Sequence, residues 1–318
     1  MTANPLISAA SGATAMAMVG GGVAVSRALT HAPLFAAQGA RYAIATAILF
    51  AVGRRQVRRP RGREWAWLAA VASSGLVVFN IAVVRGVQHA SPAAIGVAVA
   101  LVPIALAVVG ALLEGRRPRQ RVLAAAVVVT VGSGLVEGFG HASAVGALWA
   151  VVVLCCEAGF TLLAVPVLPR HGAWGVSLHA TWMGALGYVV LAVSTEGAGA
   201  FWSLTMPQWG AVLFLAVMVT AVAFVLWYTA VSSLGSDRAG LLTGVVPASA
   251  ALLGVATGAA WPARLAWVGV AVVGTGLALG MSASQGLATP RTTRCGIRDG
   301  TSTTEPEVSF DVQTTAGA

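Results

Sequence analysis

The sequence predicts an all-α membrane protein with ten transmembrane helices, arranged as two five-helix halves of opposite orientation. Of its 318 residues, 58% are hydrophobic and only 9% are charged, whereas a soluble domain has roughly 25% charged residues. Apolar runs of about twenty residues recur along the chain, the length that crosses ~30 Å of hydrocarbon. A sequence pattern also recurs in the two halves. These observations exclude a water-soluble globule, a disordered chain and a membrane β-barrel.

The hydropathy pattern divides the chain into ten spans and a polar tail. We expect the spans at residues 6–26, 33–52, 66–85, 92–113, 121–138, 145–165, 175–195, 207–229, 238–260 and 264–284. Residues 1–138 form the first predicted half and residues 145–284 the second. Residues 285–318 are rich in Thr, Ser, Gly and acids, which predicts a disordered cytoplasmic tail.

The net charge of +9 comes from arginines in short loops between apolar runs, so we interpret it as a topology signal and expect no nucleic-acid partner. With ten spans, the arginine-rich loops 53–65 and 114–121 fall on the same side. Counting every loop and the tail, 15 of the 19 arginines lie on that side and 3 on the other, with Arg41 inside a span. Because arginine excess marks the cytoplasmic side, we expect both termini in the cytoplasm.

An internal repeat relates the two halves. Val102-Pro103 aligns with Val246-Pro247 at an offset of 144 residues, and residues 131–135 (VGSGL) match residues 273–277 (VGTGL) at an offset of 142. Five spans is an odd number, so the second half enters the membrane from the opposite face. Such inverted repeats are typical of secondary transporters. The 38 glycines favour close helix packing.

Several motifs of the first half resemble one transporter domain. The segment HASPAAI at residues 89–95 is followed by Pro103, by Glu114 before an arginine-rich loop, and by VGSG at residues 131–134. This order resembles the EamA domain of the drug/metabolite transporter superfamily. The sequence around Arg41 resembles the arginine-containing second helix of that family.

The resemblance covers residues 1–284 and is weaker in the second half, which keeps Pro247 but has Gly258 where Glu114 would stand. It implies a ten-helix protein with both termini in the cytoplasm. It also implies export or exchange of amino acids, other metabolites or toxic compounds.

Ionisable residues inside spans are costly and therefore informative. Glu157 is the acid that we place deepest in the membrane. Because burial favours the neutral form of a carboxyl, Glu157 is a candidate for exchanging a proton against a cationic substrate; alternatively, it hydrogen bonds a helix neighbour such as Thr161. Arg41 keeps its charge and is a candidate for holding a substrate carboxylate. Its alternatives are pairing with Glu157 or extending towards the membrane surface.

Four further polar or aromatic residues are candidate substrate contacts. His179 could relay protons or simply hydrogen bond a carbonyl, and Asn80 could contact substrate or a neighbouring helix. Trp227 and Tyr228 close the predicted eighth span, where they could line a cavity or belong to an interfacial aromatic belt. We expect a central cavity lined by the second, third, sixth, seventh and eighth spans.

Pro103 and Pro247 occupy equivalent places in the fourth and ninth spans. Each removes a backbone hydrogen bond and bends its helix, so the pair is expected to form either a gate or two static kinks.

These residues together predict a secondary transporter of the cell membrane, which moves a small metabolite by alternating access. We expect no enzyme activity, metal or cofactor, because the sequence lacks the motifs for metal hydrolysis, nucleotide binding and nucleophilic catalysis. The expected partners are a small-molecule substrate, the lipid bilayer, protons as a coupling ion and a second copy in a homodimer. The alternative is a membrane sensor or scaffold that signals through the tail.

Overall fold

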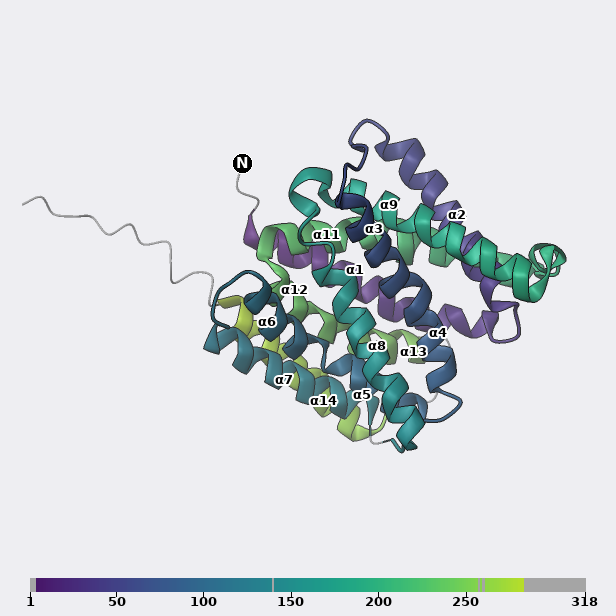
Figure 1. Cartoon of the computed structure of the whole chain (residues 1–318). Helices are drawn as coiled ribbons and strands as arrows, with labels where there is room; N and C mark the ends of the chain where they lie inside the picture. The colour runs from purple at the N-terminus through teal and green to yellow at the C-terminus, as the bar shows by residue number, and fades with distance from the viewer. Residues whose placement is uncertain (1–3, 139, 257, 259–260, 283–318) are drawn as a thin grey trace, which may run out of the picture. The chain divides into compact units, whose positions relative to one another are not determined.

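The computed structural model describes residues 4–138, 140–256, 258 and 261–282, which belong to one compact unit, Met1–Ser284 (Figure 1). The predicted tail, residues 285–318, lies outside the described residues. The described part holds ten helical spans that are long and apolar enough to cross a membrane. They are Pro5–Leu29, Leu34–Gly53, Glu64–Gly86, Pro92–Leu113, Gln120–Glu137, Ala144–Leu162, Leu168–Glu196, Met206–Leu234, Ser236–Ala256 and Arg264–Ser282.

Several spans consist of more than one helix. The α-helices in chain order are α1 (Pro5–Ser26), α2 (Leu34–Gly53), α3 (Glu64–Val71), α4 (Phe79–Gly86), α5 (Pro92–Ala100), α6 (Val102–Leu113), α7 (Gln120–Glu137), α8 (Ala144–Leu162), α9 (Leu168–Leu191), α10 (Met206–Phe214), α11 (Ala223–Leu234), α12 (Ser236–Leu241), α13 (Val245–Ala256) and α14 (Arg264–Ser282). The count of ten spans agrees with the sequence prediction, and the predicted boundaries differ most at the seventh and eighth spans.

Equivalent spans of the two halves are interrupted in similar ways. The third span contains the π-helical segment η2 (Ala72–Val78) and the eighth contains the π-helical segment η5 (Leu215–Val222). The fourth span breaks at Leu101, and the ninth passes through a 3-10 turn at Leu242–Gly244. Pro103 and Pro247 follow these breaks closely, as expected for residues that lack a backbone N–H donor.

Helix packing is also matched between the halves. The second span packs on the seventh (α2 with α9), the fourth on the ninth (α6 with α12) and the fifth on the tenth (α7 with α14), and Figure 1 shows the last pair side by side. The third span packs on the sixth (α4 with α8), and its counterpart is the eighth span on the first (α11 with α1). If the two halves are exchanged, the second–seventh, fourth–ninth and fifth–tenth contacts therefore stay the same, and the third–sixth contact becomes the eighth–first contact.

Glycines allow the closest of these helix contacts, between α7 and α14. A Cβ atom on Gly132 would lie 2.7 Å from the backbone nitrogen of Val273 and 2.8 Å from the carbonyl oxygen of Gly269. A Cβ atom on Gly269 would meet the carbonyl oxygen of Gly132 at 2.6 Å. The two backbones therefore touch where neither residue has a side chain, as small residues permit in membrane helices.

Polar contacts join the loops in pairs. Glu64, which directly follows the second loop, forms an ion pair with Arg170, which lies next to the sixth loop at the start of α9. Asp237, at the start of the ninth span, forms an ion pair with Arg116 of the fourth loop. The first and seventh loops meet where the carboxylate of Glu196 accepts backbone N–H groups of α2. Each contact joins two even-numbered loops or two odd-numbered loops. These lie on the same side when the chain crosses a membrane once per span.

Candidate functional site

A chain of polar side chains links four spans around Arg41. The Arg41 Nε donates to the hydroxyl of Thr220 at 2.8 Å, and its Nη1 donates to the Gln38 amide oxygen at 3.4 Å. The Gln38 amide nitrogen donates to the Asn80 amide oxygen at 3.3 Å. We call Gln38, Arg41, Asn80, Thr220 and Tyr188 the Arg41 cluster.

The two equivalent π-helical segments supply partners to this cluster. Thr220, which is fully buried, lies in η5. Leu76 lies in η2, and its carbonyl oxygen accepts hydrogen bonds from the Asn80 amide at 2.6 Å and from the Tyr188 hydroxyl at 2.7 Å. π-Helical segments depart from the regular ladder and occur frequently at functional sites. The cluster therefore forms where two spans depart from α-helical geometry.

Aromatic rings close one side of the Arg41 cluster. The rings of Tyr42 and Tyr188 stack with centroids 5.6 Å apart, and the Arg41 guanidinium carbon lies 5.1 Å from the Tyr42 ring centroid. Both tyrosines are buried, whereas Arg41, Gln38 and Asn80 are half-buried. A cation over an aromatic face is attracted by the ring's quadrupole, so the ring also helps to hold the guanidinium in position.

Arg41 forms no ion pair within the described part of the chain. It is thus not paired with Glu157, which was one of the predicted alternatives. Thr220 and Gln38 accept from two of its N–H donors, and the guanidinium has further donors. The cluster therefore presents a fixed positive charge that forms no ion pair with an acid of the described residues.

Glu157 lies in α8, apart from the Arg41 cluster. It is half-buried, and among the described residues its carboxylate makes no hydrogen bond or ion pair. Thr161, its predicted partner one turn on, instead accepts from the Trp227 indole at 3.1 Å. Glu157 is close enough to Tyr228 for an electrostatic interaction. The carboxylate thus has no hydrogen-bond or ion-pair partner among the described residues.

Trp227 and Tyr228 lie where α11 contacts α8. Both are buried in the core, with exposed fractions of 2% and 0%. The Tyr228 hydroxyl donates to the carbonyl oxygen of Phe160 at 3.0 Å. Because both rings are enclosed and hydrogen bonded to α8, they connect α11 to α8 and do not reach the Arg41 cluster.

His179 belongs to a different network. This network lies next to loop 54–63, at the end of the spans where that loop connects α2 to α3. The Nδ1 of His179 accepts from the Trp182 indole at 3.0 Å, and its Nε2 contacts the Arg58 carbonyl oxygen at 3.0 Å. Since Nδ1 is an acceptor and a carbonyl only accepts, the ring fits the neutral form with its proton on Nε2. His179 therefore hydrogen bonds a carbonyl, the second of its predicted alternatives.

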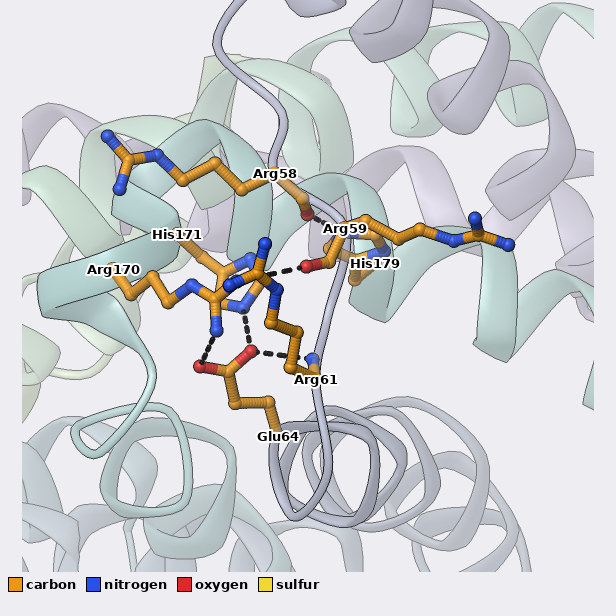
Figure 2. A network of polar contacts seen from close by, with 7 residues as sticks. All are labelled: Arg58, Arg59, Arg61, Glu64, Arg170, His171 and His179. Atoms are coloured by element: carbon orange, nitrogen blue, oxygen red, sulfur yellow. Dashed lines mark hydrogen bonds and ion pairs between the residues drawn. The ribbon is translucent and has the colours of Figure 1, made fainter.

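Glu64 is the centre of a neighbouring network (Figure 2), whose His171 ring meets the His179 ring edge to face with centroids 5.5 Å apart. The Glu64 carboxylate accepts from Arg170 at 2.7 Å, from the Arg61 backbone N–H at 2.8 Å, and contacts His171 Nε2 at 3.1 Å. The His171 side chain is completely buried. We call Glu64, Arg170 and His171 the Glu64 network; it ties the third span to the start of α9.

A second ion network lies on loop 114–119. Arg116 donates to Glu114 at 2.7 Å and lies 3.1 Å from the buried carboxylate of Asp237. The hydrogen bond that Arg116 donates to Glu114, and then the charge of Asp237, raise the pKa of the Arg116 guanidinium above its ordinary value. Arg116 is therefore a permanent cation that connects the fourth loop to the ninth span.

The structure thus brings Arg41 and Asn80 together and leaves Glu157, His179 and the Trp227–Tyr228 pair at other places. Sequence reasoning did not single out Gln38, Thr220 or Tyr188. Gln38 had a usable signal, since it lies one helical turn before Arg41 within an apolar span. Thr220 and Tyr188 had none, because their roles depend on which spans become neighbours.

Comparison with known proteins gives a consistent result. The family model described as the EamA-like transporter family matches residues 7–137 and again residues 144–281. An uncharacterized transporter of Bacillus subtilis (strain 168), YetK, is 26% identical over 253 residues, which cover 76% of each chain. A probable terminal-alkyne amino-acid exporter of Streptantibioticus cattleyicolor is 25% identical over 231 residues, 67% of this chain and 77% of the exporter.

A solved crystal structure shares the fold. It superposes with a TM-score of 0.74 over 89% of this chain and 99% of its own, at 20% sequence identity.

Proposed function

Because the chain belongs to the EamA-like transporter family, we propose that it is a secondary transporter of the cell membrane that exports a small metabolite bearing a carboxylate, such as an amino acid. The observation that carries this proposal is the half-buried Arg41, which has no acid partner among the described residues. A charge in hydrocarbon costs at least ~2.5 kcal/mol. A bound carboxylate would offset that cost through charge-assisted hydrogen bonds.

The remaining residues of the cluster suit the rest of an amino acid. The Asn80 and Gln38 side-chain amides carry both donors and acceptors, so they can accept from a substrate ammonium group. The relative named as a probable amino-acid exporter supports the same substrate class.

Alternating access between two inverted halves is the mechanism we favour. Support comes from the double family match, from π-helical segments and proline-linked breaks at equivalent positions, and from helix contacts that map onto one another. Two such halves can exchange conformations and expose a shared site to each side in turn. In this proposal the breaks at Pro103 and Pro247 act as paired hinges.

The contacts at the two ends would act as gates in this mechanism. The Glu64 network and the Arg116–Asp237 pair hold the halves together at one end. The Glu196 carboxylate, which accepts from Phe35 and Ala36 backbone N–H groups at 2.9 Å, holds them at the other. Opening either end would break the contacts there while the opposite contacts persist.

Flux measurements in proteoliposomes test the substrate class. We expect Arg41→Gln to abolish counterflow of radiolabelled amino acids and Arg41→Lys to keep a small part of it, because an ammonium keeps the charge without the planar fork. Arg121→Gln is the matched control, since Arg121 is exposed on α7. In the wild type, amine analogues without the carboxylate should not compete. Competition by these analogues equal to that of the amino acids would refute the proposed role of Arg41.

Proton coupling through Glu157 is a further part of the proposal. A half-buried carboxylate without a partner can gain and lose a proton during the cycle. We expect Glu157→Gln to lose the stimulation of flux by an imposed pH gradient while exchange persists. Glu137→Gln, at the end of α7, is the control. Gradient-driven flux that is unchanged in Glu157→Gln would remove this residue from the coupling mechanism.

A further inference from the structure

A groove of about 500 Å³ runs between α2 and α9 at the end that carries loop 54–63. On the α2 side it is lined by Ala43, Thr46, Ala47 and Phe50, which are spaced as one face of a helix. On the α9 side it is lined by residues that include Trp182. Its volume falls in the range of roughly 300–1,000 Å³ that small-ligand sites occupy.

The groove lies on the face of α2 opposite Arg41, because Ala43, Ala47 and Phe50 share a helix face that Arg41 does not. Phe50 is 57% exposed, and Ala43 and Ala47 are exposed too. The lining is apolar apart from Thr46 and His179, and both nitrogens of His179 are already engaged. A surface of this kind within a membrane-spanning segment suits a hydrocarbon chain.

Two arginines stand at the loop end of this groove. Arg54 continues the face of α2 that lines it, because its backbone is helical and its N–H donates to the Phe50 carbonyl oxygen at 3.1 Å. Arg58 follows Val57, which lines the groove, and its carbonyl oxygen is held by His179. In Figure 2 the Arg58 side chain extends away from the polar network and from His179, and makes none of the contacts drawn there.

No acid of the described residues neutralises the positive charge of Arg54 and Arg58. Within the described residues neither Arg54 nor Arg58 forms an ion pair, and both are exposed. Glu64, the acid next to this loop, is already bound by Arg170 and His171. An anion at the mouth of the groove would therefore meet two free guanidinium groups, which are suited to phosphate.

We propose that this groove binds an anionic phospholipid, with one acyl chain along the Ala43–Phe50 face of α2 and the phosphate on Arg54 and Arg58. The apolar groove and the cationic rim select different parts of the same molecule. The site is separate from the Arg41 cluster, so lipid binding there would stabilise the α2–α9 contact without competing with substrate.

Lipid titration of the purified full chain, followed by native mass spectrometry, tests this site. The probes are phosphatidylglycerol, phosphatidylcholine with the same acyl chains, and water-soluble glycerol 3-phosphate. We expect phosphatidylglycerol to bind more tightly than phosphatidylcholine by up to ~25-fold, since each arginine near a membrane surface contributes about fivefold. Glycerol 3-phosphate should not bind at the same concentrations, because it lacks the acyl chains.

Variants separate the two parts of the site. Arg54→Gln with Arg58→Gln should reduce phosphatidylglycerol affinity to that of phosphatidylcholine, whereas Arg117→Gln with Arg119→Gln, exposed arginines of the other loop, should not. Ala47→Trp should weaken both lipids by filling the groove, and Ala43→Phe repeats that test; thermal unfolding verifies that each variant folds. Equal binding of the two lipids by the wild type would overturn the proposal. So would an equal effect of the control pair, unchanged binding in both groove variants, or tight binding of glycerol 3-phosphate.

Discussion

Gly132 gives a sharp test of how the fifth and tenth spans are held together. An alanine there would place its Cβ 2.7 Å from the Val273 nitrogen and 2.8 Å from the Gly269 carbonyl oxygen. Both are backbone atoms, which cannot rotate away as a side chain can. The two helices would therefore have to separate. Gly134, two residues later on α7, has nothing within 4 Å of the same added atom.

The comparison of the two alanine variants isolates the packing contribution. Replacing glycine by alanine inside a helix gains about 1 kcal/mol from conformational preference at either position. Overpacking a close contact costs about 1–3 kcal/mol, and only Gly132→Ala incurs that cost. We therefore expect Gly132→Ala to be about 1–3 kcal/mol less stable than Gly134→Ala.

Unfolding of the purified protein in mixed micelles of increasing denaturing-detergent content measures this difference. The opposing helix provides an independent repeat, because Gly269→Ala meets the Gly132 carbonyl oxygen whereas Gly274→Ala has nothing within 4 Å. Equal free energies of unfolding for Gly132→Ala and Gly134→Ala would refute the argument that backbone contact requires glycine there.

Two further substitutions test individual hydrogen bonds. Glu196→Ala removes the acceptor of the Phe35 and Ala36 N–H groups. Because the first turn of α2 then loses its cap, the free energy of unfolding should fall by about 1–2 kcal/mol, and by less in Glu196→Gln. An unchanged stability of Glu196→Ala would contradict this capping role. Trp227→Phe keeps a buried aromatic ring but loses the hydrogen bond to Thr161. The free energy of unfolding should fall by about 1 kcal/mol, and substrate affinity should be unchanged. A large loss of substrate affinity would instead place Trp227 at the substrate site.

The number of spans could be predicted from the sequence because each span is an apolar run bounded by polar residues. The predicted span boundaries differ from those of the structure where a helix continues through polar residues, because hydropathy places the end of a span at such residues. The seventh span has an extra first turn from Leu168, in which Arg170 and His171 are held by Glu64. Gly172, with a φ of 63°, separates this turn from the rest of α9, so the predicted start at residue 175 lies close to the start of the continuous helix. The eighth extends to Leu234 and not to residue 229, because hydroxyl groups such as those of Ser232 and Ser233 bond to the helix backbone.

The candidate site was predictable only in part, for a related reason. A charged residue in a span is visible in the sequence, so Arg41 and Asn80 could be selected. Which charged residues meet depends on the contacts between spans, and His179 faces loop 54–63 and not Arg41. Hydropathy carries no signal for the π-helical segments, so the contribution of Thr220 could not be foreseen.

The central claim is that two five-span halves cross the membrane in opposite directions, and cysteine labelling tests it most directly. Single cysteines at Arg55, Arg117, Ser203 and Trp261 would be introduced into a chain whose own three cysteines are replaced, and labelled in intact cells with a membrane-impermeant maleimide. Arg55 and Ser203 lie in equivalent loops of the two halves, as do Arg117 and Trp261. We expect Ser203 and Trp261 to react from outside, and Arg55 and Arg117 only after the cells are opened. Labelling of Arg55 and Ser203 from the same face would contradict the inverted arrangement and the transport mechanism built on it.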